Sequence, residues 1–186
     1  MTVLEQALAE IVALLESLRI DYMVVGGIAN AVWGEPRATV DVDVTIAVDE
    51  PAIPNTIDQI GRRIQLAVAD PLPFVRDTRV LPLDSQNGVR VDVIFALLPF
   101  EVDAIRRARA VMLAGRAVRV VTPEDLVLMK IISERERDVA DAEALTRRRI
   151  HEISSISSRA FATSPLYSND RRFLLDGICG RAVASS

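Results

Sequence analysis

The sequence predicts an α+β fold in which helices flank a small mixed β-sheet. Residues 3–18 place apolar side chains at spacings of three and four, which is the pattern of an amphipathic helix. Residues 40–48 alternate apolar with polar side chains, as a strand with one buried face does. Two further apolar runs flank an Asn87-Gly88 pair, a strong signal for a β-hairpin. A chain of 186 residues, half of them apolar, is long enough to bury a core around such elements.

The N-terminal half of the chain is predicted to alternate helices and strands. Glutamates separate the apolar positions of the first helix, which we expect to pack its apolar face on the sheet. The following elements are expected in this order: a strand over residues 22–25, a turn at Gly26-Gly27, a helix over residues 28–33, a loop holding Arg37, and a strand over residues 40–48.

The strand over residues 40–48 carries two carboxylates, Asp41 and Asp43, between valines. Because strand side chains point to opposite faces with a period of two, both carboxylates share one face, about 7 Å apart at the backbone. Like charges this close raise each other's pKa unless a cation lies between them, and a divalent metal ion is the usual cation. The alternative is that Asp41 and Asp43 form the exposed polar face of an edge strand.

A second acidic strand follows in the middle of the chain. Residues 51–67 favour a helix with a row of isoleucines on one face, and residues 78–83 and 89–95 favour the two strands of the hairpin. Asp92 lies alone in the second of these otherwise apolar strands. Burying a carboxylate without a partner costs several kcal/mol. A metal ion, an arginine, or exposure at a sheet edge or surface hairpin must therefore account for Asp92.

The C-terminal part begins with a predicted helix over residues 100–113 and a strand over residues 117–121. Thr122-Pro123-Glu124-Asp125 is a helix start, in which Thr122 is the N-cap and Asp125 bonds back to the cap. Lys130 lies in the apolar part of this helix and should either reach the surface or meet an anion. The chain is thus expected to divide into a core, a helical segment and a weakly ordered serine-rich tail: residues 1–121, 122–149 and 150–186.

Composition restricts the chemistry and the location of the protein. One cysteine excludes an internal disulfide, and one histidine excludes a histidine-rich metal site. A metal held by oxygen ligands favours Mg²⁺ or Mn²⁺ over Zn²⁺. A net charge of −4 gives no electrostatic footprint for general nucleic-acid binding. No apolar run is long enough to cross a bilayer, and the N-terminus does not have a signal-peptide pattern, so we expect a cytoplasmic protein without membrane association.

The motifs together resemble the nucleotidyltransferase superfamily, which has the polymerase-beta-like fold, and its AbiEii-like branch of bacterial proteins. The resemblance covers about residues 10–148. It is carried by the following motifs in chain order: Gly26-Gly27; Pro36-Arg37-Ala38-Thr39-Val40-Asp41-Val42-Asp43; Asp92; T-P-E-D-L-x-x-x-K ending at Lys130; and R-x-R-D-x-x-D ending at Asp141.

This resemblance implies a metal-dependent transfer of a nucleoside monophosphate from an NTP to an acceptor. It implies that Asp41, Asp43 and Asp92 are catalytic and hold two Mg²⁺ ions, one of which activates the attacking hydroxyl. The double glycine would approach the phosphates with its backbone amides, and Thr39 would belong to the same nucleotide-binding group. Arg37 and the catalytic Lys130 would neutralise phosphate charge. Asp138 and Asp141 would orient Lys130 or the acceptor.

The sequence departs from the superfamily pattern in two places. The turn has Gly-Gly where the superfamily more often has Gly-Ser, and the tail lacks the ordered helices that usually follow, so a truncated or frame-shifted C-terminus is one hypothesis.

The acceptor is predicted to be tRNA, another RNA, a protein or a small molecule. Several relatives in this branch are toxins, so a cognate antitoxin is a predicted partner. The alternatives are a non-catalytic interaction module of the same fold and an aminoglycoside-type small-molecule nucleotidyltransferase.

Overall fold

The computed structural model describes residues 1–34, 38–133 and 145. The chain divides into two compact units. The first comprises Met1–Ile28 and Ala38–Val121 and contains the whole described β-sheet; the second comprises Ala29–Arg37 and Thr122–Ser186. The predicted division of the chain at residues 121 and 149 remains a prediction.

A seven-stranded mixed sheet forms the centre of the first unit, and its strand order is β3-β4-β5-β2-β1-β7-β6. The strands are β1 (Asp21–Val24), β2 (Asp41–Ala47), β3 (Gln65–Leu66), β4 (Val80–Asp84), β5 (Arg90–Phe95), β6 (Arg109–Leu113) and β7 (Arg116–Val120). β2 runs parallel to β5, and β1 runs parallel to β7, whereas the remaining neighbours are antiparallel. The predicted α+β fold with a mixed sheet and flanking helices is confirmed.

The two acidic strands lie inside the sheet. β2 is flanked by β5 and β1, and β5 is flanked by β4 and β2. Neither β2 nor β5 is therefore an edge strand, and the interpretations that placed Asp41, Asp43 or Asp92 at a sheet edge are wrong. The alternation of the two strands sorts their side chains as predicted: Val42, Val44, Ile46, Val91 and Val93 are completely buried, while the three aspartates are partly exposed.

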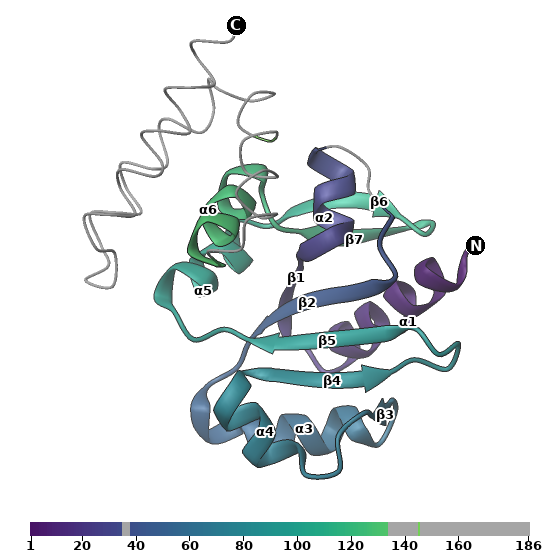
Figure 1. Cartoon of the computed structure of the whole chain (residues 1–186), viewed down its shortest axis with the longest axis vertical. Helices are drawn as coiled ribbons and strands as arrows, with labels where there is room; N and C mark the ends of the chain where they lie inside the picture. Colours follow the sequence, from purple (N-terminus) through teal and green to yellow (C-terminus); the bar gives the residue numbers. More distant parts are fainter. Residues whose placement is uncertain (35–37, 134–144, 146–186) are drawn as a thin grey trace, which may run out of the picture. The chain divides into compact units, whose positions relative to one another are not determined.

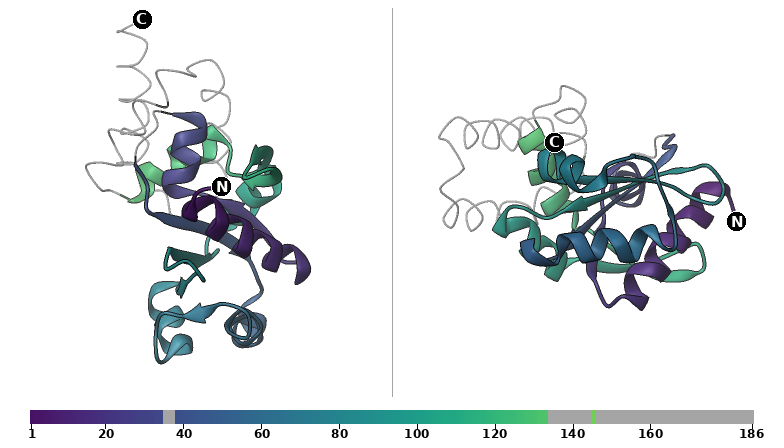
Figure 2. Two further views of the ribbon diagram at one scale, coloured as in Figure 1. Left: turned by 90° about the vertical axis from the view of Figure 1, so that its right-hand side faces the viewer. Right: turned by 90° about the horizontal axis from the view of Figure 1, so that it is seen from below.

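Helix α1 (Val3–Ser17) packs its apolar face on β1 and β2 (Figure 2). Its start is fixed by a capping box, which was not predicted from the sequence. The Glu5 N–H donates to the Thr2 hydroxyl at 3.2 Å, and the Thr2 N–H donates to Oε2 of Glu5 at 2.7 Å. Six residues of the helix are buried, with the spacing expected of one face: Ala7, Leu8, Ile11, Val12, Leu14 and Leu15. The prediction of this helix is confirmed to within a residue.

The segment between the acidic strands differs from the sequence prediction. The predicted helix over residues 51–67 is a 3-10 turn, η1 (Glu50–Ala52), followed by α3 (Ile53–Gly61), and the chain then forms β3. A further helix, α4 (Pro71–Thr78), occupies residues for which no element was predicted. Both α3 and α4 lie beside β4 (Figure 1). The predicted hairpin is confirmed: β4 and β5 are antiparallel, and Gly88 in their turn has a φ of 72°.

The predicted helix over residues 100–113 is also shorter than expected. Helix α5 (Pro99–Arg107) ends before residue 109, and residues 109–113 form β6, which pairs with β7 as a hairpin. The turn between these strands places Ala114 and Gly115 at φ values of 51° and 76°, the left-handed region that a tight hairpin turn requires. Short apolar runs fit a helix or a strand equally well by period, so pairing with β7 decides the conformation here.

The second unit is described through α2 and α6. Helix α2 (Gly26–Trp33) begins in the first unit, and α6 (Pro123–Ser133) begins after Thr122 as predicted. The Thr122 hydroxyl accepts from the Asp125 N–H at 3.2 Å and donates to Oδ2 of Asp125 at 2.8 Å. Apart from Leu145, the rest of the predicted helical segment after residue 133 and the predicted tail lie outside the described residues. Among the helices of the described part, none is both long and apolar enough to cross a membrane.

One buried polar group in β2 leads to a stability prediction. Thr45 is completely buried, and its Oγ1 has no hydrogen-bond partner among the described residues. An unsatisfied buried hydroxyl costs about 1–3 kcal/mol, so replacing it with a methyl group of the same shape should remove that cost. We expect Thr45→Val to raise the free energy of unfolding by about 1 kcal/mol and the Tm by about 2–4 °C. Calorimetry or urea denaturation measures both quantities.

Thr56 offers the matched control for this prediction. It is also buried, at 5% exposure, but its hydroxyl donates to the Ala52 carbonyl at 3.0 Å. Thr56→Val removes a satisfied group and should lower stability or leave it unchanged. Stabilisation of both variants to the same degree would mean that the gain comes from added hydrophobicity rather than from the unsatisfied hydroxyl of Thr45.

Candidate active site

The candidate site is built on the polar face of β2 and β5. The parallel register places Asp41 opposite Arg90 and Asp43 opposite Asp92. Residues opposite each other on neighbouring strands lie about 5 Å apart and share a face. Asp41, Asp43 and Asp92, which come from two separate parts of the sequence, are therefore adjacent on one partly exposed face. The sequence placed Asp41 and Asp43 together, and the pairing of β2 with β5 brings Asp92 beside them.

Gly26 brings the start of α2 against this face. Its φ is 61°, a conformation that residues with a side chain rarely adopt. A Cβ atom added to Gly26 would lie 1.9 Å from Oδ2 of Asp43, so glycine is required by the close approach as well as by the backbone angle. The Val25 N–H donates to the Asp43 carbonyl at 2.9 Å and fixes the turn to β2. The first backbone N–H groups of α2 thus lie beside the Asp43 carboxylate.

Gly27 and Thr39 form a second close contact at the same place. A Cβ atom on Gly27 would lie 2.3 Å from Oγ1 of Thr39. That hydroxyl donates to Oδ1 of Asp41 at 2.8 Å. Thr39, which was predicted to belong to the nucleotide-binding group, is therefore hydrogen-bonded to the carboxylate of the first aspartate. The absence of a side chain at Gly27 leaves room for this contact.

Asp92 has an arginine as its partner. Nε of Arg90 lies 2.8 Å from Oδ1 of Asp92, and the two side chains are 47% and 29% exposed. The sequence is compatible with a metal ion, an arginine, or exposure at a sheet edge or surface hairpin for Asp92. An arginine is the partner found, although Arg90 itself was not singled out. The signal was present in the sequence, because Arg90 precedes Asp92 by two residues and so shares its face.

The donor chemistry and the backbone register of this face fit a divalent cation. Three carboxylates from adjacent strands supply hard oxygen ligands, the kind that Mg²⁺ and Mn²⁺ prefer. The side chains as they stand do not converge: the described residues contain no group of three or more His, Cys, Asp or Glu side chains placed to hold a metal ion. Thr39 engages Asp41, and Arg90 engages Asp92. Binding of a metal ion by all three carboxylates would therefore require side-chain rearrangement on a backbone that already places them together.

The other predicted site residues do not belong to the described part of the first unit. Arg37, Asp138 and Asp141 lie outside the described residues. Lys130 is 7% exposed in α6 and belongs to the second unit. Lys130 is thus buried rather than at the surface, and its predicted contact with an anion stays a prediction.

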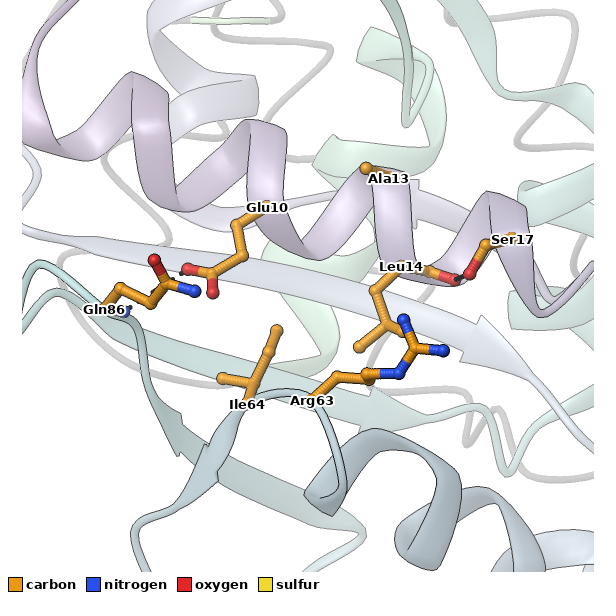
Figure 3. A pocket seen from close by; sticks show the side chains of 7 residues that line it. All are labelled: Glu10, Ala13, Leu14, Ser17, Arg63, Ile64 and Gln86. Atoms are coloured by element: carbon orange, nitrogen blue, oxygen red, sulfur yellow. Dashed lines mark hydrogen bonds between the residues drawn. The ribbon is translucent and has the colours of Figure 1, made fainter.

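A separate pocket in the first unit contains none of the predicted site residues. It has a volume of about 410 Å³ and lies between α1, the end of α3 and the β4–β5 turn (Figure 3). Glu10 lies near Gln86 at one end of the pocket, and Arg63 lies near Leu14. The full lining is Glu10, Ala13, Leu14, Ser17, Arg63, Ile64 and Gln86. We assign this pocket no part in the candidate active site.

A glycine turn at the start of a short helix, held against two acidic strands of a mixed sheet, is the arrangement of the nucleotidyltransferase class. The family described as "Nucleotidyltransferase of unknown function (DUF6036)" matches residues 2–173. The chain belongs to this family, which confirms the superfamily that the sequence resembles. A search of curated proteins found no match.

Solved structures share the fold at low sequence identity. An antigenic nucleotidyltransferase-like protein from Paracoccidioides brasiliensis matches with a TM-score of 0.55 at 20% identity, covering 87% of this chain and 88% of that chain. The lincosamide antibiotic adenylyltransferase LnuA, in its lincomycin-bound structure, matches with a TM-score of 0.52 at 16% identity, covering 76% and 96%. ANT(2")-Ia, solved with adenylyl-2"-tobramycin, matches with a TM-score of 0.52 at 13% identity, covering 97% and 99%.

Proposed function

We propose that this protein is a divalent-metal-dependent nucleotidyltransferase that moves a nucleoside monophosphate from an NTP to a hydroxyl-bearing acceptor. The observation that carries the proposal is the register of β2 and β5, which places Asp43 opposite Asp92 on the face that also holds Asp41. Membership of a family described as nucleotidyltransferases supports the same conclusion. The fold is shared with the lincosamide antibiotic adenylyltransferase LnuA and with ANT(2")-Ia, which was solved with adenylyl-2"-tobramycin, and this is consistent with the proposal.

The proposed roles of the residues follow from their positions. Asp41, Asp43 and Asp92 would hold Mg²⁺ or Mn²⁺, which when bound would neutralise phosphate charge and lower the pKa of the attacking hydroxyl. Thr39 would orient the Asp41 carboxylate. Gly26 and Gly27 would let the triphosphate approach the unpaired N–H groups at the start of α2, where the helix dipole also favours an anion.

Two cations complete the proposed site by resemblance to the superfamily. Arg37 and Lys130 would neutralise phosphate charge, and Asp138 and Asp141 would orient Lys130 or the acceptor. With charge stabilisation and in-line positioning supplied in this way, transfer of the nucleoside monophosphate and release of pyrophosphate need no covalent intermediate on the protein.

The direct test supplies the nucleotide and leaves the acceptor open. Purified protein would be incubated with each α-labelled NTP, Mg²⁺, and separate fractions of total RNA, cellular protein and small metabolites. We expect label to move to one fraction, which identifies the acceptor class. Aminoglycosides and lincosamides should be included as separate arms, because LnuA is a lincosamide antibiotic adenylyltransferase and ANT(2")-Ia was solved with adenylyl-2"-tobramycin. No transfer, together with no NTP binding by calorimetry, would favour the non-catalytic interaction module.

The predictions of a toxin role and a cytoplasmic location remain predictions. A toxin that modifies RNA or protein should arrest growth when it is expressed alone, and a cognate antitoxin should restore growth. A variant lacking the Asp41 and Asp43 carboxylates should not arrest growth. Growth arrest that persists in this variant would separate toxicity from nucleotidyl transfer.

Thr39 provides a graded test of the proposed site. Its hydroxyl donates to Oδ1 of Asp41, and a hydrogen bond to a charged group contributes about 1.5–3 kcal/mol. We expect Thr39→Val to lower kcat/KM about tenfold or more, because Asp41 loses its orientation while the shape against Gly27 is kept. Thr39→Ser should retain most of the activity. Equal rates for the valine and serine variants would mean that the hydroxyl does not position the carboxylate.

A further inference from the structure

Arg90 is the single cation on the acidic face formed by the described strands β2 and β5. It lies opposite Asp41 in the strand register and contacts Asp92 through Nε at 2.8 Å. The face thus combines three carboxylates with one guanidinium. Arg90 is 47% exposed, so its long side chain is not fixed by burial.

The position of Arg90 sets up a competition for Asp92. Neighbours on this face are about 5 Å apart across the strands and about 7 Å apart along them, so all four charged groups interact. A guanidinium and a divalent cation both bind carboxylate oxygens, and they repel each other at this distance. Asp92 contacts Arg90, and Asp41 contacts Thr39. Among the described residues, no group of three or more His, Cys, Asp or Glu side chains is placed to hold a metal ion.

We propose that Arg90 is an internal competitor for the divalent cation: a positioning residue that holds Asp92 until a cation takes its place. This inference rests on the proposed function, since it concerns the same three aspartates. With Arg90 in place, the formal charge of the four groups is that of two carboxylates rather than three. The protein without nucleotide therefore binds divalent cations more weakly than its three carboxylates alone would.

The competition has a definite sign and a modest size. A partly exposed ion pair contributes little free energy. Its loss changes an equilibrium constant about two- to fivefold. Removing the guanidinium should tighten cation binding by this factor. A purely structural role predicts the opposite, because an Arg90 that merely holds Asp92 in a metal-binding orientation would weaken cation binding when it is removed.

The test measures Mn²⁺ binding directly, without nucleotide and without an activity assay. Free Mn²⁺ would be followed by electron paramagnetic resonance at low ionic strength for the wild type, Arg90→Gln, Arg90→Lys and Arg106→Gln. Arg106 is the matched control because it pairs with Asp103 at 3.0 Å on α5, outside the candidate site. Both glutamine variants change the net charge equally. We expect Arg90→Gln to bind Mn²⁺ about two- to fivefold more tightly, and the lysine variant and the control to stay within twofold of the wild type.

The outcomes separate this inference from the proposed function. If the wild type binds Mn²⁺, Asp41→Asn/Asp43→Asn does not, and Arg90→Gln binds equally or more weakly, only the role of Arg90 is overturned. Binding by Arg90→Lys as tight as by Arg90→Gln would also overturn it, because lysine keeps the competing charge. If neither the wild type nor Arg90→Gln binds Mn²⁺, both proposals fail. Should Arg90→Gln not fold, Arg90→Met removes the same charge and retains an apolar stem.

Discussion

Replacing Asp41 and Asp43 by asparagine is expected to reduce nucleotidyl transfer about 10³-fold or more, to the detection limit of the labelled-NTP assay. Asparagine keeps the size of the side chain but removes the charge that a divalent cation requires. Loss of a single preorganised charge-stabilising group typically costs 10²–10³-fold in kcat, and this double variant also removes the proposed metal ligands. The two side chains are partly exposed, so the fold should persist.

Asp58→Asn is the control for this experiment. Asp58 is exposed on α3, and its replacement makes the same chemical change without altering the acidic face. It should retain wild-type kcat/KM, and circular dichroism should show both variants folded. Transfer by Asp41→Asn/Asp43→Asn at a rate near that of the wild type would contradict the assignment of these residues as metal ligands.

Gly26→Ala is expected to lower both stability and activity. The substitution places a side chain at a φ of 61°, which costs about 1–2 kcal/mol, and its Cβ would lie 1.9 Å from Oδ2 of Asp43. Overpacking of this kind typically adds about 1–3 kcal/mol. We therefore expect the free energy of unfolding to fall by about 2–5 kcal/mol, measured by urea denaturation. Activity should fall further than stability explains, because the Asp43 carboxylate must move.

Gly88→Ala separates the two contributions. Gly88 has a φ of 72° in the β4–β5 turn, and a Cβ atom added there would meet nothing within 4 Å. This variant carries the backbone cost alone, so it should lose about 1–2 kcal/mol and keep its activity. Equal destabilisation of the two alanine variants, with activity retained in both, would show that the close approach of Gly26 to Asp43 has no functional consequence.

The environment of Asp92 was only partly predictable from the pattern of its own strand. A carboxylate in an apolar strand needs either a partner or exposure to solvent. The sequence predicted a metal ion or an arginine as the partner, or exposure at a sheet edge or surface hairpin. The sheet order excludes the edge, and the ion pair with Arg90 supplies the arginine. The strand order does not follow from the sequence of β5 alone, because it depends on pairing between segments far apart in the chain. The arginine, in contrast, lies within β5 itself, two residues before Asp92 and on the same face.

Helices and strands were predicted best where a periodic segment was long or where a turn signal was strong. The helix over residues 3–18 and the hairpin around Asn87-Gly88 agree with the structure, as do the strands that carry Asp41 and Asp92. The predictions failed in short segments. Residues 109–113 form a strand rather than the end of a helix, and residues 71–78 form a helix that was not predicted. In such segments, contacts with the rest of the sheet outweigh the weak local preference.

The sequence by itself determined the acidic face of β2, the position of the glycine turn and the superfamily, because these depend on local spacing and a two-residue period. Only the tertiary structure decided that Asp92 joins Asp41 and Asp43 and that Gly26 approaches the Asp43 carboxylate. The physical reason is that each of these contacts depends on how backbone and side chains pack in three dimensions. Those arrangements are fixed by strand pairing and by the burial of the apolar face beneath the strands.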